Sequence, residues 1–573
     1  MNIPARGKRV TRQTCAVRQN APGSTGTLAR SLATLGTLIL LTTISPAQID
    51  LNLQTTVQTG AVVVGSAGVL GSGDVLLAGG NVSASGLTRA LFVGGNFRQT
   101  AGAELTLRLG GTASGQFDRL VVLGSANVGG RLQVEALSGF APVGGDTFTV
   151  VTAGGGVNGQ FAQVQDNLTA GTALQATLRY SSNSVVLVYV QSDFRGFVAT
   201  PNQAAAAGAL DVVVTERGAA ELVAFLNTQQ TTSLPAAFEI IAPEEIGAIF
   251  EISRSAAKMQ ALSVEHRLDD IRAARLPAPA PESGFSKDGK TAKEIRPIAP
   301  PENRWGFWAQ GGGEFVDVGD TSNARGYDFD SGGVTFGVDY RFSDHFAAGV
   351  LLNYTRTRAE LGGDGRIDAN AFRGGLYAGV FGENAYLNAY VGGGYNDYDI
   401  RREGFDGMPH GSTEGGEFNG LVAAGYDAHF GDFTIGPVAS YQYTYTSYDG
   451  YLEDGSLAPL RIDSQHAESS RTNVGLRMSY AGHIGSALVT PEVRATWQHE
   501  FGDVAYATDA RFAFGGPQFT SHSAEVGRDS LLLRAGFSVQ HTPTFSTYAY
   551  YEGELCRTNY EAHNVYIGGR LSF

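Results

Sequence analysis

The chain has few cysteines and few charged residues, and both scarcities exclude classes of protein. Its only cysteines are Cys15 and Cys556, so neither a disulfide framework nor a cysteine-based zinc site can be built. Charged residues make up 17% of the 573 residues, whereas Gly reaches 77. This composition is typical of β-structure with many tight turns, and not of a disordered acidic chain or a helical enzyme. The net charge of −14 argues against a nucleic-acid partner.

Histidine and lysine are absent from residues 48–235, which restricts the catalysis that this region could support. The first histidine is His266, and the first lysine after Lys8 is Lys258. A Ser-His-Asp triad, a Cys-His pair, a His-ligated metal site and a Ser-Lys dyad are therefore excluded from the region. We predict no catalytic residue, no metal site and no cofactor. An enzymatic domain here would have to work with acidic side chains alone.

One glycine pattern deserves a separate test, because it matches a dinucleotide-binding fingerprint. Gly154, Gly156 and Gly159 have the spacing of that motif and follow a strand-like run. The motif requires a helix to begin next, since the helix N-terminus holds the pyrophosphate. Residues 160–164 instead continue as another strand, so the pattern favours a turn between strands.

Long apolar runs are missing too, with one exception near the N-terminus. A basic region is followed by the apolar run 32–44 and by Ser45-Pro46-Ala47. This order is that of a secretory signal, with cleavage between Ala47 and Gln48 and with the Sec translocon as a partner. A membrane anchor is the alternative, but about 13 apolar residues are short for a bilayer span. No later run reaches 18 apolar residues, so the exported chain should be soluble or inserted as a closed barrel.

Three segments of different composition follow the predicted signal, residues 1–47. Residues 48–200 hold short β-branched runs bounded by Gly clusters, which favours a β-solenoid of stacked coils. Residues 201–275 have helical spacing, and Pro243-Glu244-Glu245 suits a helix N-terminus. Residues 276–302 are Pro-rich and predict a semi-rigid extended linker with a reach of about 80 Å.

The remaining segment, residues 303–573, contains all three Trp and most of the Tyr. We count about twelve stretches of alternating polarity separated by Gly, Asp and Asn turns. In one of them Val334, Phe336 and Val338 alternate with polar or small residues. Strand side chains point to opposite faces with period two, so each stretch has an apolar and a polar face. A soluble sandwich would alternate as well, but with shorter strands and fewer aromatics. The pattern predicts a 12-stranded antiparallel transmembrane β-barrel with a polar lumen.

At this point the sequence resembles the autotransporter family of type V secretion. The likeness covers nearly all of residues 303–573, and no single motif decides it. It is carried by Trp305 to Gly311, Pro491 to Asp503, Val526 to Gly536 and Asn564 to Phe573. Upstream, Gly95 to Phe161 is similar to the last coils of β-helical passengers, and Thr200-Pro201-Asn202-Gln203 is similar to the junction between passenger and barrel.

The resemblance implies a location, partners and a mechanism. The barrel lies in the outer membrane of a Gram-negative-type bacterium, in contact with its lipid. The barrel-assembly machinery recognises the last strand, here through Tyr566, Leu571 and Phe573, and the passenger moves outward to the cell surface. Some members cleave the passenger at an Asn pair, but residues 231–302 contain no Asn, so we expect the passenger to stay attached. A Pro-rich linker before the first strand departs from the best-known members, which leaves open whether helix or linker occupies the pore.

Five charged residues of the predicted barrel are candidates for the lumen face. Glu492, Arg494 and Glu500 share one face of a strand, and Glu552 and Glu554 share a face of another. Ordinary hydration and strand pairing explain them, and holding the translocating segment is the alternative.

The leading hypothesis for the whole chain is a mainly all-β autotransporter, with an α-helical connecting segment. It would display a small, non-catalytic passenger that is adhesive or structural and that binds a cell-surface or matrix ligand. A porin-like channel with a plug segment and an enzymatic passenger are the alternatives.

Overall fold

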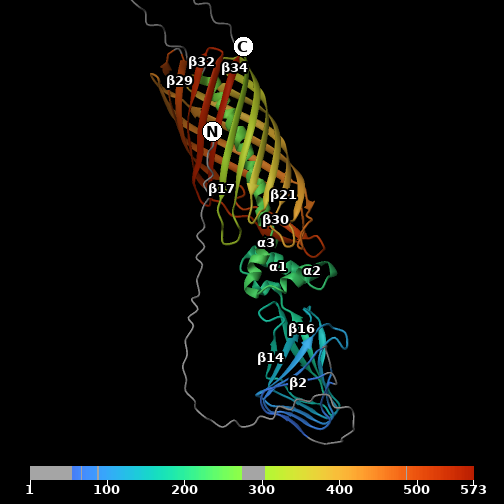
Figure 1. The fold of residues 1–573 in the computed structure, drawn as a ribbon. Coiled ribbons are helices and arrows are strands. Elements are labelled where there is room, and N and C mark those ends of the chain that lie inside the picture. The colour runs from blue at the N-terminus through green and yellow to red at the C-terminus, as the bar shows by residue number, and fades with distance from the viewer. Residues whose placement is uncertain (1–53, 66–67, 87–89, 274–303, 486) are drawn as a thin grey trace, which may run out of the picture. The chain divides into compact units, whose positions relative to one another are not determined.

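The computed structural model describes residues 54–65, 68–86, 90–273, 304–485 and 487–573 (Figure 1). The predicted cleavage site, Ala47 and Gln48, and the predicted linker, residues 276–302, lie outside the described residues. The described part contains an N-terminal β-domain, a group of helices and a large closed sheet. The predicted class, mainly β with a 12-stranded antiparallel barrel and an α-helical segment before it, is confirmed.

The N-terminal β-domain consists of three sheets that the chain visits in turn. The first two sheets have the orders β1-β4-β7-β10-β13 and β2-β5-β8-β11-β14, and the third contains β3, β6, β9 and β12. All neighbouring pairs among these strands are parallel, so the chain winds in coils of three short strands. The strands are β1 Thr55–Val57, β2 Ala61–Val64, β3 Val69–Gly71, β4 Val75–Leu77, β5 Gly80–Ala84, β6 Ala90–Val93, β7 Phe97–Gln99, β8 Ala103–Leu109, β9 Arg119–Val122, β10 Ala126–Val128, β11 Arg131–Ala136, β12 Thr147–Ala153, β13 Val157–Gly159 and β14 Gln163–Asp166.

Alternation within these short strands builds the core of the domain. Every second side chain points inward, and Leu77, Val82, Leu105 and Leu120 are fully buried there. An antiparallel pair, β15 (Leu174–Tyr180) and β16 (Ser184–Gln191), ends the domain by pairing β16 with β12. Gly154 and Gly156 lie in the turn between β12 and β13, Gly159 ends β13, and the next element is the strand β14 and not a helix.

The helical group begins directly after the β-domain. It comprises η1 Phe194–Phe197, α1 Pro201–Val213, η2 Arg217–Ala219, α2 Ala220–Leu226, η3 Thr231–Ser233, α3 Leu234–Ile241, η4 Glu244–Gly247 and α4 Ala248–Ala273. A capping box starts α1: the Thr200 hydroxyl accepts from the backbone N–H of Gln203, the Gln203 side chain accepts from Thr200, and Pro201 occupies the first turn. In the described part of the chain, no helix combines the length and apolar character needed to cross a membrane.

The closed sheet is a barrel of twelve long antiparallel strands. Strand β17 pairs with β34, and β22 pairs with β24, so no edge remains open. The strands are β17 Trp305–Val318, β18 Tyr327–Ser343, β19 Phe346–Glu360, β20 Arg366–Phe381, β21 Ala385–Arg401, β22 His410–Tyr426, β24 Phe433–Tyr448, β27 Gln465–Tyr480, β29 Ala487–Glu500, β32 Asp529–Thr542, β33 Phe545–Arg557 and β34 Tyr560–Ser572, with β23 Ala428–Phe430 and β28 Gly482–Ile484 as short additions.

The two ends of the barrel differ. Five connections at one end are tight turns, such as residues 344–345 and 543–544, and this end also holds the paired termini of the barrel, Trp305 and Phe573. The other end carries long loops, including residues 449–464 and 501–528. Short turns face the periplasm and long loops face outward in bacterial barrels, so we call these the periplasmic and extracellular ends.

The outer wall carries an apolar belt next to the periplasmic end. On β18 the outward side chains of Val334, Phe336 and Val338 are exposed and apolar. Nearer the extracellular end the outward side chains become charged, as at Asp328 and Asp330. Residues 334–342 therefore span the lipid, which matches the 9 to 11 residues that a tilted membrane strand needs. The remaining residues of each strand rise above the bilayer.

Inside the wall, tyrosine rings lie on glycines of neighbouring strands, which explains why both residue types are frequent. A Cβ atom added to any of these glycines would lie too close to the neighbouring tyrosine ring. The pairs are Tyr377 on Gly349, Tyr390 on Gly375, Tyr386 on Gly425, Tyr548 on Gly568 and Tyr566 on Gly312. Each ring fills the place of a missing side chain, so the wall is smooth although its residues vary in size.

We predict that Gly349→Val destabilises the barrel by about 1–3 kcal/mol, because a Cβ there would lie 2.5 Å from the ring of Tyr377. The measurement is the heating temperature at which the fast-migrating band of the folded barrel is replaced by the slower band of the unfolded protein in a denaturing gel. Gly374→Val is the matched control, since its Cβ would meet only ordinary contacts on the outer wall. Equal melting temperatures for the two variants would contradict the packing argument.

Candidate functional site: the helix-filled lumen

Helix α4 lies inside the barrel, as Figure 1 shows. Every residue from Ala248 to Leu268 is buried, although the helix is rich in charged side chains. It runs from the extracellular end, where Phe250 packs on Tyr448 and Tyr506, to the periplasmic end, where Arg272 lies over the ring of Tyr386. The question whether helix or linker occupies the pore is thereby answered: α4 fills it.

The lumen has two zones with different chemistry. Near the extracellular end the inward side chains of the strands are apolar, and Ile249, Phe250 and Ile252 of α4 pack among them. Deeper in the barrel one side of α4 meets charged and polar side chains of the wall, while Ala261, Val264, Leu268 and Ile271 pack on apolar ones. Because an unpaired buried charge costs several kcal/mol, each ionic side chain of α4 needs a partner in the wall.

Lys258 is held by three glutamates of the wall. Its Nζ lies 2.9 Å from a carboxylate oxygen of Glu554 and 3.7 Å from oxygens of both Glu314 and Glu552. All four side chains are buried. One turn earlier on the helix, the hydroxyl of Ser255 donates to Glu314. The wall at this level is acidic, and α4 meets it with a cation.

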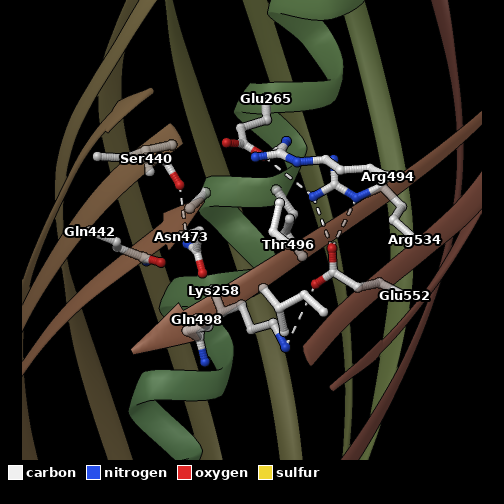
Figure 2. A pocket seen from close by; sticks show the side chains of 14 residues that line it. Lys258, Glu265, Ser440, Gln442, Asn473, Arg494, Thr496, Gln498, Arg534 and Glu552 are labelled. Carbon is white, nitrogen blue, oxygen red and sulfur yellow. Dashed lines mark hydrogen bonds and ion pairs between the residues drawn. The ribbon is translucent and has the colours of Figure 1, made fainter. Parts of the chain in front are cut away.

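The sign reverses two turns further along α4, at Glu265. Its carboxylate lies 2.9 Å from Nη1 of Arg494 and 3.3 Å from Nη2 of Arg534. Arg534 also binds Glu552 at 2.9 Å, so the Lys258 and Glu265 clusters are joined through the wall. Figure 2 shows these side chains converging on α4 from different strands.

Arg267 forms the best-aligned pair of the lumen. Its Nε and Nη2 donate to the two carboxylate oxygens of Asp339 at 2.5 and 2.6 Å, a bidentate arrangement. The hydroxyl of Tyr377 also donates to Asp339, at 2.8 Å, and accepts from the indole N–H of Trp308 at 2.7 Å. A chain of buried hydrogen bonds therefore fixes the acid to which α4 is bound.

The last turn of α4 is paired at the periplasmic end. Arg272 lies 2.9 Å from Asp427, and Asp270 lies 3.2 Å from Arg570. The wall thus offers acids, then bases, then acids again along the helix, and α4 presents the opposite sign at each level. A slip by one helical turn, 5.4 Å, would move Lys258, Glu265 and Arg267 away from the partners described above. The ionic pattern therefore sets both the register and the rotation of α4.

A small cavity lies beside the helix. A cavity of about 30 Å³ lies between α4 and the wall, lined by residues that include Lys258, Glu265 and Gln498 (Figure 2). This volume holds about one water molecule. The filled barrel is therefore a closed pore at the level of this cavity.

The five residues singled out in the sequence all have buried side chains, but they do different things. Arg494, Glu552 and Glu554 contact α4 directly, as described above. Glu492 binds Arg477 of the neighbouring strand at 2.7 Å. Glu500 accepts from the hydroxyl of Ser469 at 2.6 Å and from backbone N–H groups. Three of the five therefore hold the helix, and two brace the wall.

Sequence reasoning missed the residues of α4 itself, above all Lys258, Glu265 and Arg267. Their signal was present: a segment at helical spacing carries many charged residues between its apolar ones. Such a helix is either solvated or enclosed by polar partners. The partners Glu314 and Asp339 lie on strands that are distant in sequence, so only the fold reveals them.

The three residues proposed as an assembly signal do not share one surface. Leu571 and Phe573 point outward and are exposed, whereas Tyr566 is buried in the lumen against Met259 and Leu262 of α4. The period of two along β34 accounts for this, because residues 566 and 573 are an odd number of positions apart. The role of these three residues in barrel assembly stays a prediction.

A second polar cluster, which we call the polar joint, lies at the extracellular end and consists of Asn202, Glu244, Asn323 and His522. The amide of Asn202 donates to Glu244 at 2.8 Å and to the backbone carbonyls of Asn323 and His522. Its carbonyl oxygen accepts from the backbone N–H of His522 at 2.9 Å. Glu244 also accepts from the backbone N–H of Arg325. The joint ties α1 and η4 to two extracellular loops of the barrel.

Burial raises the pKa of Glu244 to about 7, against the hydrogen bonds from Arg325 and Asn202, which favour the carboxylate. Burial also raises the pKa of the adjacent Glu245, against the attraction of Arg325. A carboxyl whose pKa is higher in the folded state takes up a proton on folding. Its contribution to stability is present at low pH and is lost as the pH rises through about 7.

We predict that reversing the charge of Lys258 opens the pore. Lys258→Glu places a fourth acid among Glu314, Glu552 and Glu554, and breaking such a buried pair costs about 3–5 kcal/mol. Purified protein in planar lipid bilayers should then show frequent open events that the parent protein lacks. Arg356→Glu, a reversal on the exposed outer wall above the belt, is the control. A Lys258→Glu protein as closed as the control would show that the ion pairs do not hold α4.

We also predict that the polar joint is tighter at pH 6 than at pH 8. Amides of α1 should exchange hydrogen faster at pH 8 once intrinsic rates are corrected, and Glu244→Gln should flatten this dependence. Glu221→Gln on exposed α2 is the matched control and should leave the dependence unchanged. An unchanged pH dependence in Glu244→Gln would rule out this carboxyl as its source.

Comparison with known proteins places the barrel in a family. A family model, the autotransporter β-domain, matches residues 307–552. Among curated proteins, an extracellular serine protease of Serratia marcescens is 23% identical over 461 residues, covering 74% of this chain and 43% of the protease. Esterase EstA of Pseudomonas aeruginosa is 29% identical over 188 residues, covering 31% of this chain and 29% of the esterase. The chain thus spans less than half the length of the curated relatives that it matches.

Among solved structures, the translocator domain of autotransporter NalP from Neisseria meningitidis has a TM-score of 0.42 at 14% identity, covering 57% of this chain and 99% of that one. The β-domain of the Bordetella autotransporter BrkA has a TM-score of 0.38 at 22% identity, covering 47% of this chain and 100% of that one. The match of the family model coincides with the barrel strands described above. Residues 307–552 are therefore an autotransporter β-domain, and the barrel lies in the outer membrane of a Gram-negative bacterium.

Proposed function

We propose that this protein displays its own N-terminal β-domain at the cell surface, where that domain stays attached and acts as a non-catalytic adhesive or structural passenger. The observation that carries the proposal is the path of the chain. Helix α4 runs through the barrel from the extracellular to the periplasmic end, and the helices and the β-domain precede it without interruption. A chain that enters the lumen from outside must hold its N-terminal part outside.

Attachment follows from the same path. The ion pairs of Lys258, Glu265 and Arg267 hold α4 along its length, so the passenger is anchored by a helix that is bound over several turns. Residues 231–302 contain no Asn, which removes the asparagine chemistry by which some relatives release a passenger. In this proposal the Sec translocon and the barrel-assembly machinery are the partners during export, and lipid is the partner of the mature barrel.

The names of two curated relatives raise an enzymatic passenger as the second candidate. The extracellular serine protease aligns with most of this chain, yet this chain covers only 43% of it, so its activity does not transfer. The chain has no His before His266, and within residues 48–235 it has no Lys. Catalysis in the β-domain would have to rely on Asp and Glu alone, which supports the non-catalytic proposal.

A porin-like channel is the third candidate. Its plug would be α4, and its open state would require the helix to leave a lumen that pairs it at five levels. The burial of every residue of α4 from Ala248 to Leu268 supports a pore that is closed in the resting protein.

Protease treatment of intact cells tests the display. We expect proteinase K to degrade the β-domain, residues 54–191, from outside while the barrel and α4 survive as a protected fragment. Degradation only after the outer membrane is permeabilised would sink the proposal. The same cells, assayed with chromogenic ester and peptide substrates, should hydrolyse them no faster than cells that lack the protein. Substrate turnover that disappears with residues 54–191 would instead establish the enzymatic passenger.

A further inference from the structure

Two long extracellular loops of the barrel fold into a small sheet of their own, which we call the loop sheet. It has the order β25-β26-β30-β31 and consists of Tyr451–Leu452, Leu460–Ile462, Ala507–Phe512 and Phe519–His522. One face of the loop sheet is apolar and almost fully buried; its members are Leu460, Ile462, Ala510, Phe512 and Phe519. Strands of two to six residues cannot bury such a face by themselves.

The cover over this face is the group of helices before α4, residues 194–247, which we call the connecting helices. Helix α1 packs on β31, and η4 packs on β30 and β31. The buried side chains of the connecting helices and those of the loop sheet form one continuous hydrophobic core. Neither half would have an interior without the other.

The fit between the two halves is close. A Cβ atom on Gly218 would lie 2.6 Å from the side chain of Phe514, and one on Gly516 would lie 3.0 Å from Val213. The ring of Phe225 packs at a tilt on Phe405 of a third loop, with the ring centroids 4.8 Å apart. Glycine is thus used on each side where the partner approaches, which indicates a specific interface and not a loose collapse.

Polar contacts fix the orientation of the interface. The polar joint connects Asn202 and Glu244 to the loops that carry Asn323 and His522. Elsewhere Arg402 donates to the backbone carbonyl of Ile240 at 3.1 Å and is held by Glu453. Satisfied buried polar groups of this kind permit one arrangement and penalise others.

The connecting helices and the lumen helix form one continuous piece. Helix η4 ends at Gly247 and α4 begins at Ala248, with no residue between them. When the connecting helices sit on the loop sheet, α4 is therefore already positioned at the mouth of the barrel. Docking outside and plugging inside are coupled by the backbone.

From these observations we propose that the loop sheet is the docking site for residues 194–247 of the same chain, and that this docking is the closing step of export. The inference rests on the proposed surface display of the β-domain. While another part of the chain still passes through the lumen, α4 cannot hold all its wall contacts, because every residue from Ala248 to Leu268 is buried when those contacts are made. The connecting helices then cannot be docked either, and the apolar face of the loop sheet is exposed to solvent. Once the passenger has left the lumen, docking covers that face and fixes α4.

The test uses the full chain and a matched pair of substitutions on one strand. Ala510→Asp places a charge in the buried interface, and Ala507→Asp places the same charge at an exposed position of β30. A compact, heat-modifiable band for both variants shows that the barrel has assembled. We then compare the rate at which the β-domain becomes protease-accessible on intact cells, the protease sensitivity of residues 194–247, and the opening of purified protein in planar bilayers.

For Ala510→Asp we expect arrival of the β-domain at the parent rate, cleavage within the connecting helices, and pore openings that are about tenfold more frequent. Ala507→Asp should match the parent in all three. A pore as closed as the parent in Ala510→Asp, or protected connecting helices, would overturn the proposal. So would a β-domain that fails to appear although the barrel is folded, because docking would then precede export. If the parent's β-domain never becomes accessible, the proposed function fails, while the opening measurement still reports on docking.

Discussion

The structure depends on one constraint: a charge buried in the barrel must find its partner inside the barrel. Helix α4 packs an apolar stripe, Ala261, Val264, Leu268 and Ile271, on the wall, but it also carries cations and anions that are buried with it. It is stable in the lumen because Glu554, Asp339, Arg494 and Arg570 meet it with the opposite sign at successive levels. Removing a single partner would leave a desolvated charge, so the wall and the helix specify each other. The closed pore, the direction of the chain and the attachment of the β-domain all follow from this match.

The sequence was a good guide wherever one period governs a long segment. Period two along residues 334–342 predicts a strand with an apolar outer face, and repetition of that pattern predicts the barrel. Local capping signals at Thr200 and Gln203 likewise mark the start of the connecting helices. The same period places Tyr566 and Phe573 on opposite faces of the last strand, and in β34 Tyr566 is buried while Phe573 is exposed. A strand pattern therefore gives the face correctly only when its parity is followed residue by residue.

What could not be predicted depends on contacts between segments that are far apart in the chain. The partner of Lys258 is nearly 300 residues away at Glu554, and helical spacing alone does not tell a solvated charged helix from an enclosed one. The loop sheet is a stronger example, because β25 and β31 are too short to show any periodicity. Its residues look like loop sequence until the connecting helices cover them. The fold supplies this information through the pairing of distant strands, which no local pattern contains.

The two zones of the barrel respond to different conditions, and this separates their roles. The ion pairs of α4 are buried, so salt screens them little, and closure of the lumen should hold over a wide range of ionic strength. The apolar interface of the connecting helices is equally insensitive to salt. The polar joint differs, because burial raises the pKa of Glu244 to about 7 and so makes its strength depend on proton concentration near neutrality. Helix α4, whose ion pairs respond little to salt, thus follows directly on the polar joint, whose strength depends on pH. The pH-dependent element lies at the extracellular end.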